Sequence, residues 1–293
     1  MHAAQPIFLH YTKAELDRNF DQRGWIKDAE TILARDVERS RRTREKLTFI
    51  PNLRYGEHPD EVLDFFPSAR KDAPIQVFVH GGAWKNFTKD NYSFPAEGFG
   101  PAGFSTAILN FSKLPNVRLP TMIDQVRRGV PWIYKNAERL GSNPERLYMS
   151  AHSSGAHLAA NTLLSDWSAL DCPADTVKAA ACVSGPYDLE PVMLSARSSY
   201  VLLDKAEVAA LSVTRHTDRI PCPVVVAYTD GDTDEFQRQS REFATALERS
   251  GRLAGYRRFS GFNHFELMGQ FGEPGGELVQ FILNHLQETE GGA

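Results

Sequence analysis

Cysteine is scarce in this chain, and long apolar runs are absent. The 293 residues include only Cys172, Cys182 and Cys222, an odd number with no closely spaced pair. A disulfide framework is therefore not expected. No stretch approaches the roughly 18 apolar residues of a membrane span, and the first residues lack the basic segment and apolar core of a signal peptide. We expect a reduced, cytoplasmic setting and no membrane association.

The chain also lacks an excess of positive charge. Its 33 Lys and Arg residues face 37 Asp and Glu residues, which gives a formal net charge of -4. The densest basic run, residues 39–46, is interrupted by Glu45 and lies on an expected helix, so it is interpreted as a solvated face. This balance gives no argument for a nucleic-acid partner. Hydrophobic residues make up 42% of the sequence, enough for an ordinary globular core.

Short apolar runs alternate with segments of helical spacing. Leu119, Met122, Val126 and Ile133 recur on one face of an expected helix at residues 119–140. Apolar runs bounded by turn residues predict strands at 47–53, 62–66, 75–79, 105–111, 147–151, 177–183, 224–229 and 254–259. This alternation predicts an α/β fold with a mostly parallel central sheet covered by helices on both faces. We expect residues 1–293 to form a single domain.

Two segments stand outside this alternation. Residues 1–46 predict a helical N-terminal extension, in which Thr12 and Glu15 have the spacing of a capping box and helix formers run through residues 25–47. The extension is expected to pack on the main body or to form one wall of a pocket. Residues 184–220 contain weak helical patterns and no expected strand, which predicts a small cap over a site.

The segment around Ser153 has the pattern of a nucleophile elbow. An apolar run ends at Ala151, a turn follows through Ser153, and a helix-forming segment continues after Gly155. Small residues two positions on either side of the serine let strand and helix approach closely, and the turn lifts the hydroxyl clear of the sheet. Ser153 is therefore the predicted nucleophile.

A serine hydroxyl is a weak nucleophile and needs an imidazole base oriented by a carboxylate. His264, on the loop after the last predicted strand, is the candidate base. Asp232 and Asp230 both follow the strand at 224–229; we prefer Asp232 as the acid and leave Asp230 as the alternative. Loops that follow parallel strands meet at one edge of a sheet, so these groups are expected to converge.

The sequence HGGAW at residues 80–84 comes directly after another buried strand. Glycines at that place allow backbone N–H groups to face a substrate carbonyl oxygen. The predicted oxyanion donors are the N–H groups of Gly82, Ala83 and Ser154, with Gly81 required for the turn. Aromatic side chains on the same loops are candidate pocket walls, or else parts of the core: Trp84, Phe87, Tyr187, Phe262 and Phe265.

No metal or other cofactor is predicted. His152 and His157 are five residues apart, which separates them by about 140° around a helix, so they would not share a face. The sequence also contains no HExxH or CxxC pattern.

Five motifs together resemble the kynurenine formamidase-like branch of the α/β-hydrolases, which is related to the hormone-sensitive-lipase-type esterases. The motifs are HGGAW (80–84), AHSSGAHL (151–158), SGPYDLEPV (184–192), DTDEFQRQS (232–240) and NHF (263–265). The resemblance covers most of the chain from about residue 47 onward. It implies an α/β-hydrolase fold, with roles distributed as follows: nucleophile Ser153, acid Asp232, base His264, and oxyanion loop Gly81, Gly82 and Ala83.

The chain departs from that family pattern at two positions. The family usually has Gly where this chain has Ala151, and Ala where it has Ser154. The first change is mild. The second places an extra hydroxyl beside the nucleophile, which bears on substrate preference. It therefore weakens the inference that this chain shares the family's formamidase activity.

The sequence as a whole predicts a metal-independent serine hydrolase that cleaves a small amide or ester through an acyl-enzyme. An arylformamidase acting on N-formylkynurenine and a general carboxylesterase acting on short-chain esters are the alternatives. A non-catalytic ligand-binding homologue is a third alternative. Such relatives generally lose a member of the catalytic triad, whereas this chain keeps a candidate serine, acid and histidine. The expected partner is the small acyl substrate, and the formation of a homodimer is a further possibility that the sequence leaves undecided.

Overall fold

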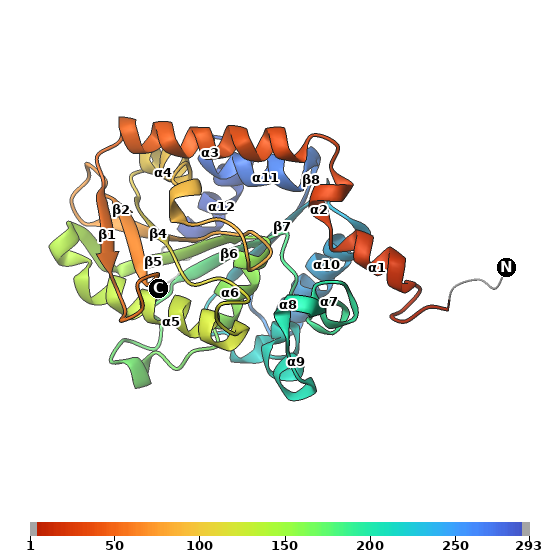
Figure 1. Cartoon of the computed structure of the whole chain (residues 1–293). Coiled ribbons are helices and arrows are strands. Elements are labelled where there is room, and N and C mark those ends of the chain that lie inside the picture. The colour runs from red at the N-terminus through yellow and green to blue at the C-terminus, as the bar shows by residue number, and fades with distance from the viewer. Residues whose placement is uncertain (1–4, 289–293) are drawn as a thin grey trace.

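The computed structural model describes residues 5–288, in which eight strands form one mixed sheet (Figure 1). The strand order is β1-β2-β4-β3-β5-β6-β7-β8. β1 and β2, and β2 and β4, pair antiparallel, whereas every pair from β4 across to β8 is parallel. The strands are β1 (Ile50–Arg54), β2 (Val62–Phe66), β3 (Ala73–Val79), β4 (Ser105–Leu109), β5 (Ser142–His152), β6 (Ala179–Val183), β7 (Val224–Gly231) and β8 (Leu253–Asn263).

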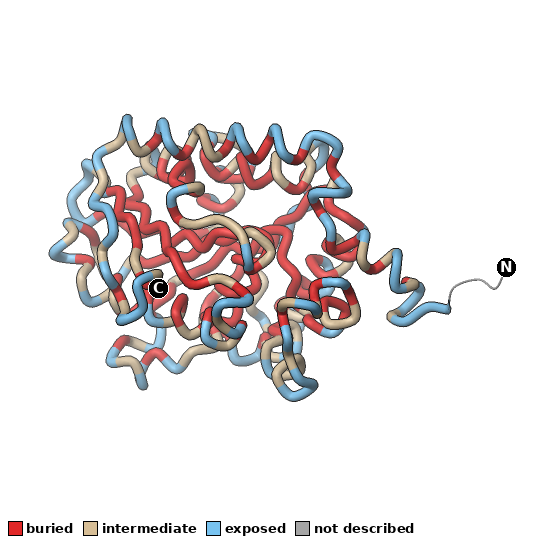
Figure 2. Tube along the Cα trace, in the orientation of Figure 1, coloured by how far each residue is buried: buried red, intermediate tan, exposed pale blue. Residues whose placement is uncertain are grey.

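Helices cover both faces of this sheet, as predicted. One face packs against α5 (Leu119–Asn136), α6 (Ser154–Thr162) and α10 (Asp234–Arg249), and the other against α4 (Pro95–Phe99), α11 (His264–Gly269) and α12 (Glu277–Glu288). β3, β4 and β6 are buried at every position, because both of their faces are covered. Figure 2 shows the buried residues concentrated in the sheet.

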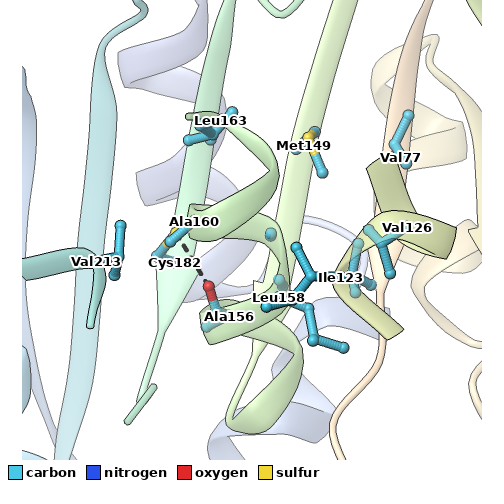
Figure 3. Close-up of a cluster of buried hydrophobic side chains, with 14 of the residues drawn as sticks. Val77, Ile123, Val126, Met149, Ala156, Leu158, Ala160, Leu163, Cys182 and Val213 are labelled. Carbon is cyan, nitrogen blue, oxygen red and sulfur yellow. Dashed lines mark hydrogen bonds between the residues drawn. The ribbon is translucent and has the colours of Figure 1, made fainter. Parts of the chain in front are cut away.

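The helix that follows Ser153 lies in the core. All nine residues of α6 are buried. Figure 3 shows its side chains Ala156, Leu158 and Ala160 between Cys182 of β6 and Ile123 of α5. Alanines at these positions let the helix lie close to the strands. α6 is therefore held on both sides, and so is the turn that carries the serine.

The N-terminal extension forms α1 (Lys13–Asn19), α2 (Gln22–Trp25) and α3 (Ala29–Lys46). The capping box predicted at Thr12 and Glu15 is present. Among the helix formers at residues 25–47, those at 29–46 make one continuous helix, and only the first residues fall outside it, because the chain turns to extended backbone at Ile26. That turn buries Ile26 with Ala29 and Ile32, a small cluster against which Phe265 packs, so tertiary packing overrides the local preference.

The insertion at residues 184–220 contains α7 (Glu190–Leu194), α8 (Ser198–Val201) and α9 (Lys205–Leu211) and no strand. It lies beside α1 in Figure 1. The backbone N–H of Ala196 donates to Asp17 at 2.6 Å, and the Arg197 side chain donates to the Phe20 carbonyl. The insertion and the extension therefore contact each other directly. None of the described helices is both long enough and apolar enough to cross a membrane.

Candidate active site

Ser153 sits in the sharp turn between β5 and α6. Its backbone has φ 55° and ψ -131°, a conformation that side-chain-bearing residues rarely adopt. The Ser153 N–H donates to the Val183 carbonyl of the neighbouring strand at 2.8 Å, which anchors the turn to the sheet. A Cβ built on Gly155 would lie 2.3 Å and 2.4 Å from the carbonyl oxygens of Val79 and His80. Only glycine fits there, as the elbow pattern requires.

Gly155→Ala is expected to lower the free energy of unfolding by about 3 kcal/mol, because the added methyl meets backbone atoms that cannot rotate away. Chemical denaturation of the purified variant measures this change. Gly100→Ala is the matched control, since a Cβ there meets nothing within 4 Å and Gly100 has helical dihedrals, so it should stay within about 1 kcal/mol of the parent. Equal stability of the two variants would contradict the close packing of the elbow.

The side chains of Ser153, His264 and Asp232 form a continuous hydrogen-bonded chain. The Ser153 Oγ lies 3.0 Å from His264 Nε2, and His264 Nδ1 lies 2.6 Å from Asp232 Oδ1. All three residues are buried. They come from the loops after β5, β8 and β7, so the parallel strands bring together residues that lie 111 and 32 positions apart.

The second carboxylate oxygen of Asp232 has its own hydrogen-bond donors. Asp232 Oδ2 accepts from the Ser184 hydroxyl at 2.6 Å and from the Thr229 N–H at 3.1 Å. Ser184 follows β6 with φ 49°, which turns its side chain out of the strand's alternation. These two donors hold the carboxylate in place behind the imidazole. Sequence reasoning did not identify Ser184 in this position, and only its place directly after a predicted strand could have suggested it.

Asp230, the alternative acid, lies apart from this chain of hydrogen bonds. Its Oδ1 accepts from the Gly261 N–H at 3.3 Å, and its Oδ2 is 3.6 Å from the Arg258 guanidinium. A hydrogen bond from the Ser260 side chain is the main cause that lowers the pKa of Asp230. Its carboxylate thus braces the C-terminal part of β8, whereas the His264 imidazole is bonded to Asp232.

A second histidine packs against the imidazole of His264. The ring centroids of His152 and His264 are 4.5 Å apart. Burial, and then the proximity of His264, lower the pKa of His152 well below its ordinary value, so this ring stays neutral. His157 faces elsewhere, with its Nε2 3.0 Å from the Leu211 carbonyl oxygen. Within residues 5–288, no three His, Cys, Asp or Glu side chains gather as metal ligands would.

The glycine-rich loop after β3 lies against the elbow. A Cβ on Gly81 would be 3.1 Å from the Ser153 Cβ, and the Trp84 N–H donates to the Ser154 hydroxyl at 3.1 Å. The hydroxyl by which the chain departs from the family pattern therefore ties this loop to α6. Gly82 has φ 118° and Ala83 φ 52°.

Three N–H groups near the elbow remain free to bind a ligand. Within the described chain, the N–H groups of Gly82, Ala83 and Ser154 donate to no protein acceptor. Gly82 and Ala83 also line the same cavity as Ser153. His80 supports the loop from behind, because its Nδ1 bonds the Gly81 carbonyl at 2.8 Å, and burial lowers its pKa to about 4.

A cavity of about 750 Å³ opens beside Ser153 and His264. Most of its lining residues come from three parts of the chain. The extension contributes Asp17, Arg18, Phe20, Asp21, Gln22 and Arg23, the oxyanion loop contributes Gly82, Ala83, Lys85, Asn86 and Phe87, and the insertion contributes Ala196, Arg197, Ser199 and Tyr200. The expectation that the extension forms one wall agrees with this lining. The insertion residues that reach the cavity were not named from the sequence, because no local pattern marks them.

Only two of the five predicted aromatic walls line this cavity, namely Phe87 and Phe265. Trp84 is buried and packs edge-on against His157, and Tyr187 is buried and stacks on Phe243. Phe262 lines a separate surface hollow beside α3. For these three side chains the prediction of a cavity wall is wrong, because packing directs them into the core or to another surface.

The fold and the site together have the arrangement of an α/β-hydrolase. The sheet is mixed, a strained serine follows β5, and a hydrogen-bonded histidine and aspartate follow β8 and β7. The model of the BD-FAE family matches residues 63–247, and the chain belongs to this family, among its kynurenine formamidase-like members. The resemblance inferred from the five motifs is thereby confirmed.

Individual relatives agree with this assignment. The chain is 30% identical over 298 residues to the kynurenine formamidase of Danio rerio, covering 95% of this chain and 98% of that protein. A solved structure from Silicibacter sp. has a TM-score of 0.81 at 23% identity, covering 92% of this chain and 99% of the other. An esterase of Pyrobaculum calidifontis has a TM-score of 0.70 at 14% identity, covering 98% and 99%. The structural likenesses show the α/β-hydrolase fold.

Proposed function

We propose that the protein is a serine hydrolase that cleaves a small amide or ester through an acyl-enzyme, with Ser153 as nucleophile, His264 as base and Asp232 as acid. The observation that carries this proposal is the hydrogen-bonded chain from Ser153 Oγ through His264 to Asp232, at 3.0 Å and 2.6 Å. Hydrogen-bond reach from nucleophile to base, and from base to orienting carboxylate, is the geometric requirement for this chemistry.

In the acylation step, His264 Nε2 takes the proton of the Ser153 hydroxyl as Oγ attacks the substrate carbonyl carbon. The negative charge that develops on the carbonyl oxygen is accepted by the N–H groups of Gly82, Ala83 and Ser154. Asp232 holds the Nδ1–H tautomer and stabilises the imidazolium. The tetrahedral intermediate collapses, the C–N or C–O bond breaks, and the leaving amine or alcohol takes the proton from His264.

In the deacylation step, a water molecule attacks the acyl-enzyme and gives its proton to His264 Nε2. The second tetrahedral intermediate expels Ser153 Oγ, which recovers that proton, and the carboxylic acid is released. Every protein group that the mechanism uses comes from the Ser153, His264 and Asp232 side chains and the backbone donors, so it requires no metal ion or cofactor.

The substrate that we favour is an aryl formamide such as N-formylkynurenine. The similarity to a kynurenine formamidase over nearly the whole chain supports it. The alternative is a carboxylesterase acting on short-chain esters, supported by the likeness of the fold to esterases. A purely ligand-binding homologue is disfavoured, because all three triad side chains are retained and hydrogen-bonded.

A comparison of kcat/KM values tests the choice between a formamidase and a carboxylesterase. The substrates are N-formylkynurenine and p-nitrophenyl esters of increasing acyl length. We expect the formamide to be preferred by about tenfold or more, the discrimination that roughly 1.4 kcal/mol of transition-state binding gives. A preference for two- to four-carbon esters would instead support the carboxylesterase. Saturable ligand binding without hydrolysis of either class would support the binding homologue and contradict the proposal.

A further inference from the structure

Among the residues that the structure describes, Arg197 is a buried cation without a counter-ion, and it lies at the wall of the active-site cavity. It stands directly before α8 in the insertion, and only 8% of its surface is exposed. The rings of Phe20, Trp84 and Phe236 surround the guanidinium, with centroids 5.3, 5.6 and 5.8 Å from its central carbon. Within residues 5–288, Arg197 makes no ion pair, and its Nη1 atom has no hydrogen-bond partner.

The orientation of this guanidinium is fixed by one protein acceptor. Its Nε and Nη2 atoms both donate to the Phe20 carbonyl oxygen, at 3.1 Å and 2.6 Å. A guanidinium has five N–H bonds, so these two contacts leave the Nη1 bonds and one Nη2 bond unused. Two of the unused bonds, one on Nη1 and one on Nη2, form the Nη1–Nη2 edge, a planar fork that binds a carboxylate through two parallel hydrogen bonds.

Burial of an unpaired cation is costly, and here it lowers the pKa of Arg197. Asp21 is the only carboxylate that acts on Arg197 in the described chain, and it does so without forming an ion pair. Asp17, also at the cavity, is already bonded to Lys13 at 2.6 Å and to the Ala196 N–H.

Cationic side chains outnumber carboxylates among the lining residues of the cavity. The cationic side chains among its lining residues are Arg18, Arg23, Lys85 and Arg197, four against the two carboxylates of Asp17 and Asp21. The whole chain, by contrast, has a formal net charge of -4. A cavity of opposite sign to the rest of the protein raises the local concentration of anions.

We propose that Arg197 is the subsite for a substrate carboxylate, so that the preferred substrates are esters or amides carrying a carboxylate apart from the scissile bond. This inference rests on the proposed function, because the same cavity holds Ser153 and His264. The substrate anion completes the Nη1–Nη2 edge and supplies the missing counter-charge. The aromatic rings around the guanidinium exclude water from the pair, which strengthens the interaction.

The test measures inhibition of p-nitrophenyl acetate hydrolysis by 4-phenylbutanoate and by its neutral analogue 4-phenylbutanamide. For the parent protein we expect the carboxylate to inhibit about 30-fold more tightly than the amide, as a desolvated, hydrogen-bonded charge pair does. In Arg197→Gln this ratio should fall to about one. Arg197→Lys, which keeps the charge without the fork, should retain an intermediate ratio.

Arg215→Gln is the matched control, because it removes the same charge from the same insertion, where Arg215 pairs with Glu190 outside the cavity lining. It should keep the parent ratio. Equal inhibition of the parent protein by acid and amide would overturn the inference, whether or not the Arg197 variants fold. If the parent hydrolyses neither N-formylkynurenine nor p-nitrophenyl acetate, the proposed function fails instead, and calorimetric binding of the same two compounds still decides the role of Arg197.

Discussion

Replacing Ser153 with alanine is expected to lower kcat by roughly 10⁶-fold, the loss that removal of a catalytic serine produces when its base remains in place. The variant keeps His264 and the backbone donors but has no atom to form the acyl-enzyme, so water must attack the bound substrate directly. Within residues 5–288 the serine hydroxyl hydrogen-bonds only to His264, so the fold should be unaffected. Steady-state hydrolysis of p-nitrophenyl acetate measures the loss.

The neighbouring serine provides a matched control for this assignment. Ser154 also has a buried hydroxyl, but that hydroxyl accepts the Trp84 N–H at 3.1 Å and lies outside the hydrogen-bonded chain through His264. Ser154→Ala should therefore lose at most about tenfold in kcat, the cost of one neutral hydrogen bond that positions the loop. A fluorophosphonate probe should label the parent and Ser154→Ala at Ser153. Labelling of Ser153→Ala at Ser154, with activity retained, would refute the assignment.

Those features that depend on a few adjacent residues were predictable from the sequence. The turn at Ser153 follows from the small residues around it, since only glycine fits at Gly155. The order of strands and helices followed from apolar periodicity, and β2 has the predicted bounds of Val62–Phe66. Parallel strands then bring the loops after β5, β7 and β8 to one edge of the sheet without any further sequence information.

Features that depend on the direction of a side chain in the folded core were not predictable in this way. Trp84 and Tyr187 lie on loops next to the site, but both rings point into the core. Ser184 reaches Asp232 because its φ is positive, and Arg197 reaches the cavity because the insertion folds against Phe20. Each of these outcomes is decided by contacts between distant segments, which no local pattern records.

The choice between the two candidate acids depended on the same kind of contact. Asp230 and Asp232 are two residues apart and follow the same strand, so the sequence supported either. In the structure Asp232 is buried and bonded to His264, Ser184 and the Thr229 N–H. Asp230 is partly exposed and bonded to the Gly261 N–H. The geometry favours Asp232 as the acid, which leaves a mutational comparison to test it.

Asp232→Asn is expected to lower kcat by about 10⁴-fold. An asparagine amide placed against His264 Nδ1 donates a hydrogen bond where the carboxylate accepted one, which favours the tautomer protonated at Nε2. That tautomer has no lone pair facing Ser153 Oγ, so it cannot take the serine proton. The amide also gives no electrostatic support to an imidazolium. The loss should appear in kcat far more than in KM, because the cavity walls are unchanged.

Asp230→Asn is the matched control, with the same chemical change two residues away. Its carboxylate contacts the Gly261 N–H and lies near Arg258, both outside the hydrogen-bonded chain that reaches Ser153. Because an exposed charge contributes about 1 kcal/mol or less, the variant should stay within a few-fold of the parent in kcat. Parallel measurement of kcat and KM for both variants decides between them. A larger loss of kcat in Asp230→Asn than in Asp232→Asn would assign the acid to Asp230. The Ser184 hydroxyl, which donates to Asp232, would then have no part in orienting the catalytic carboxylate.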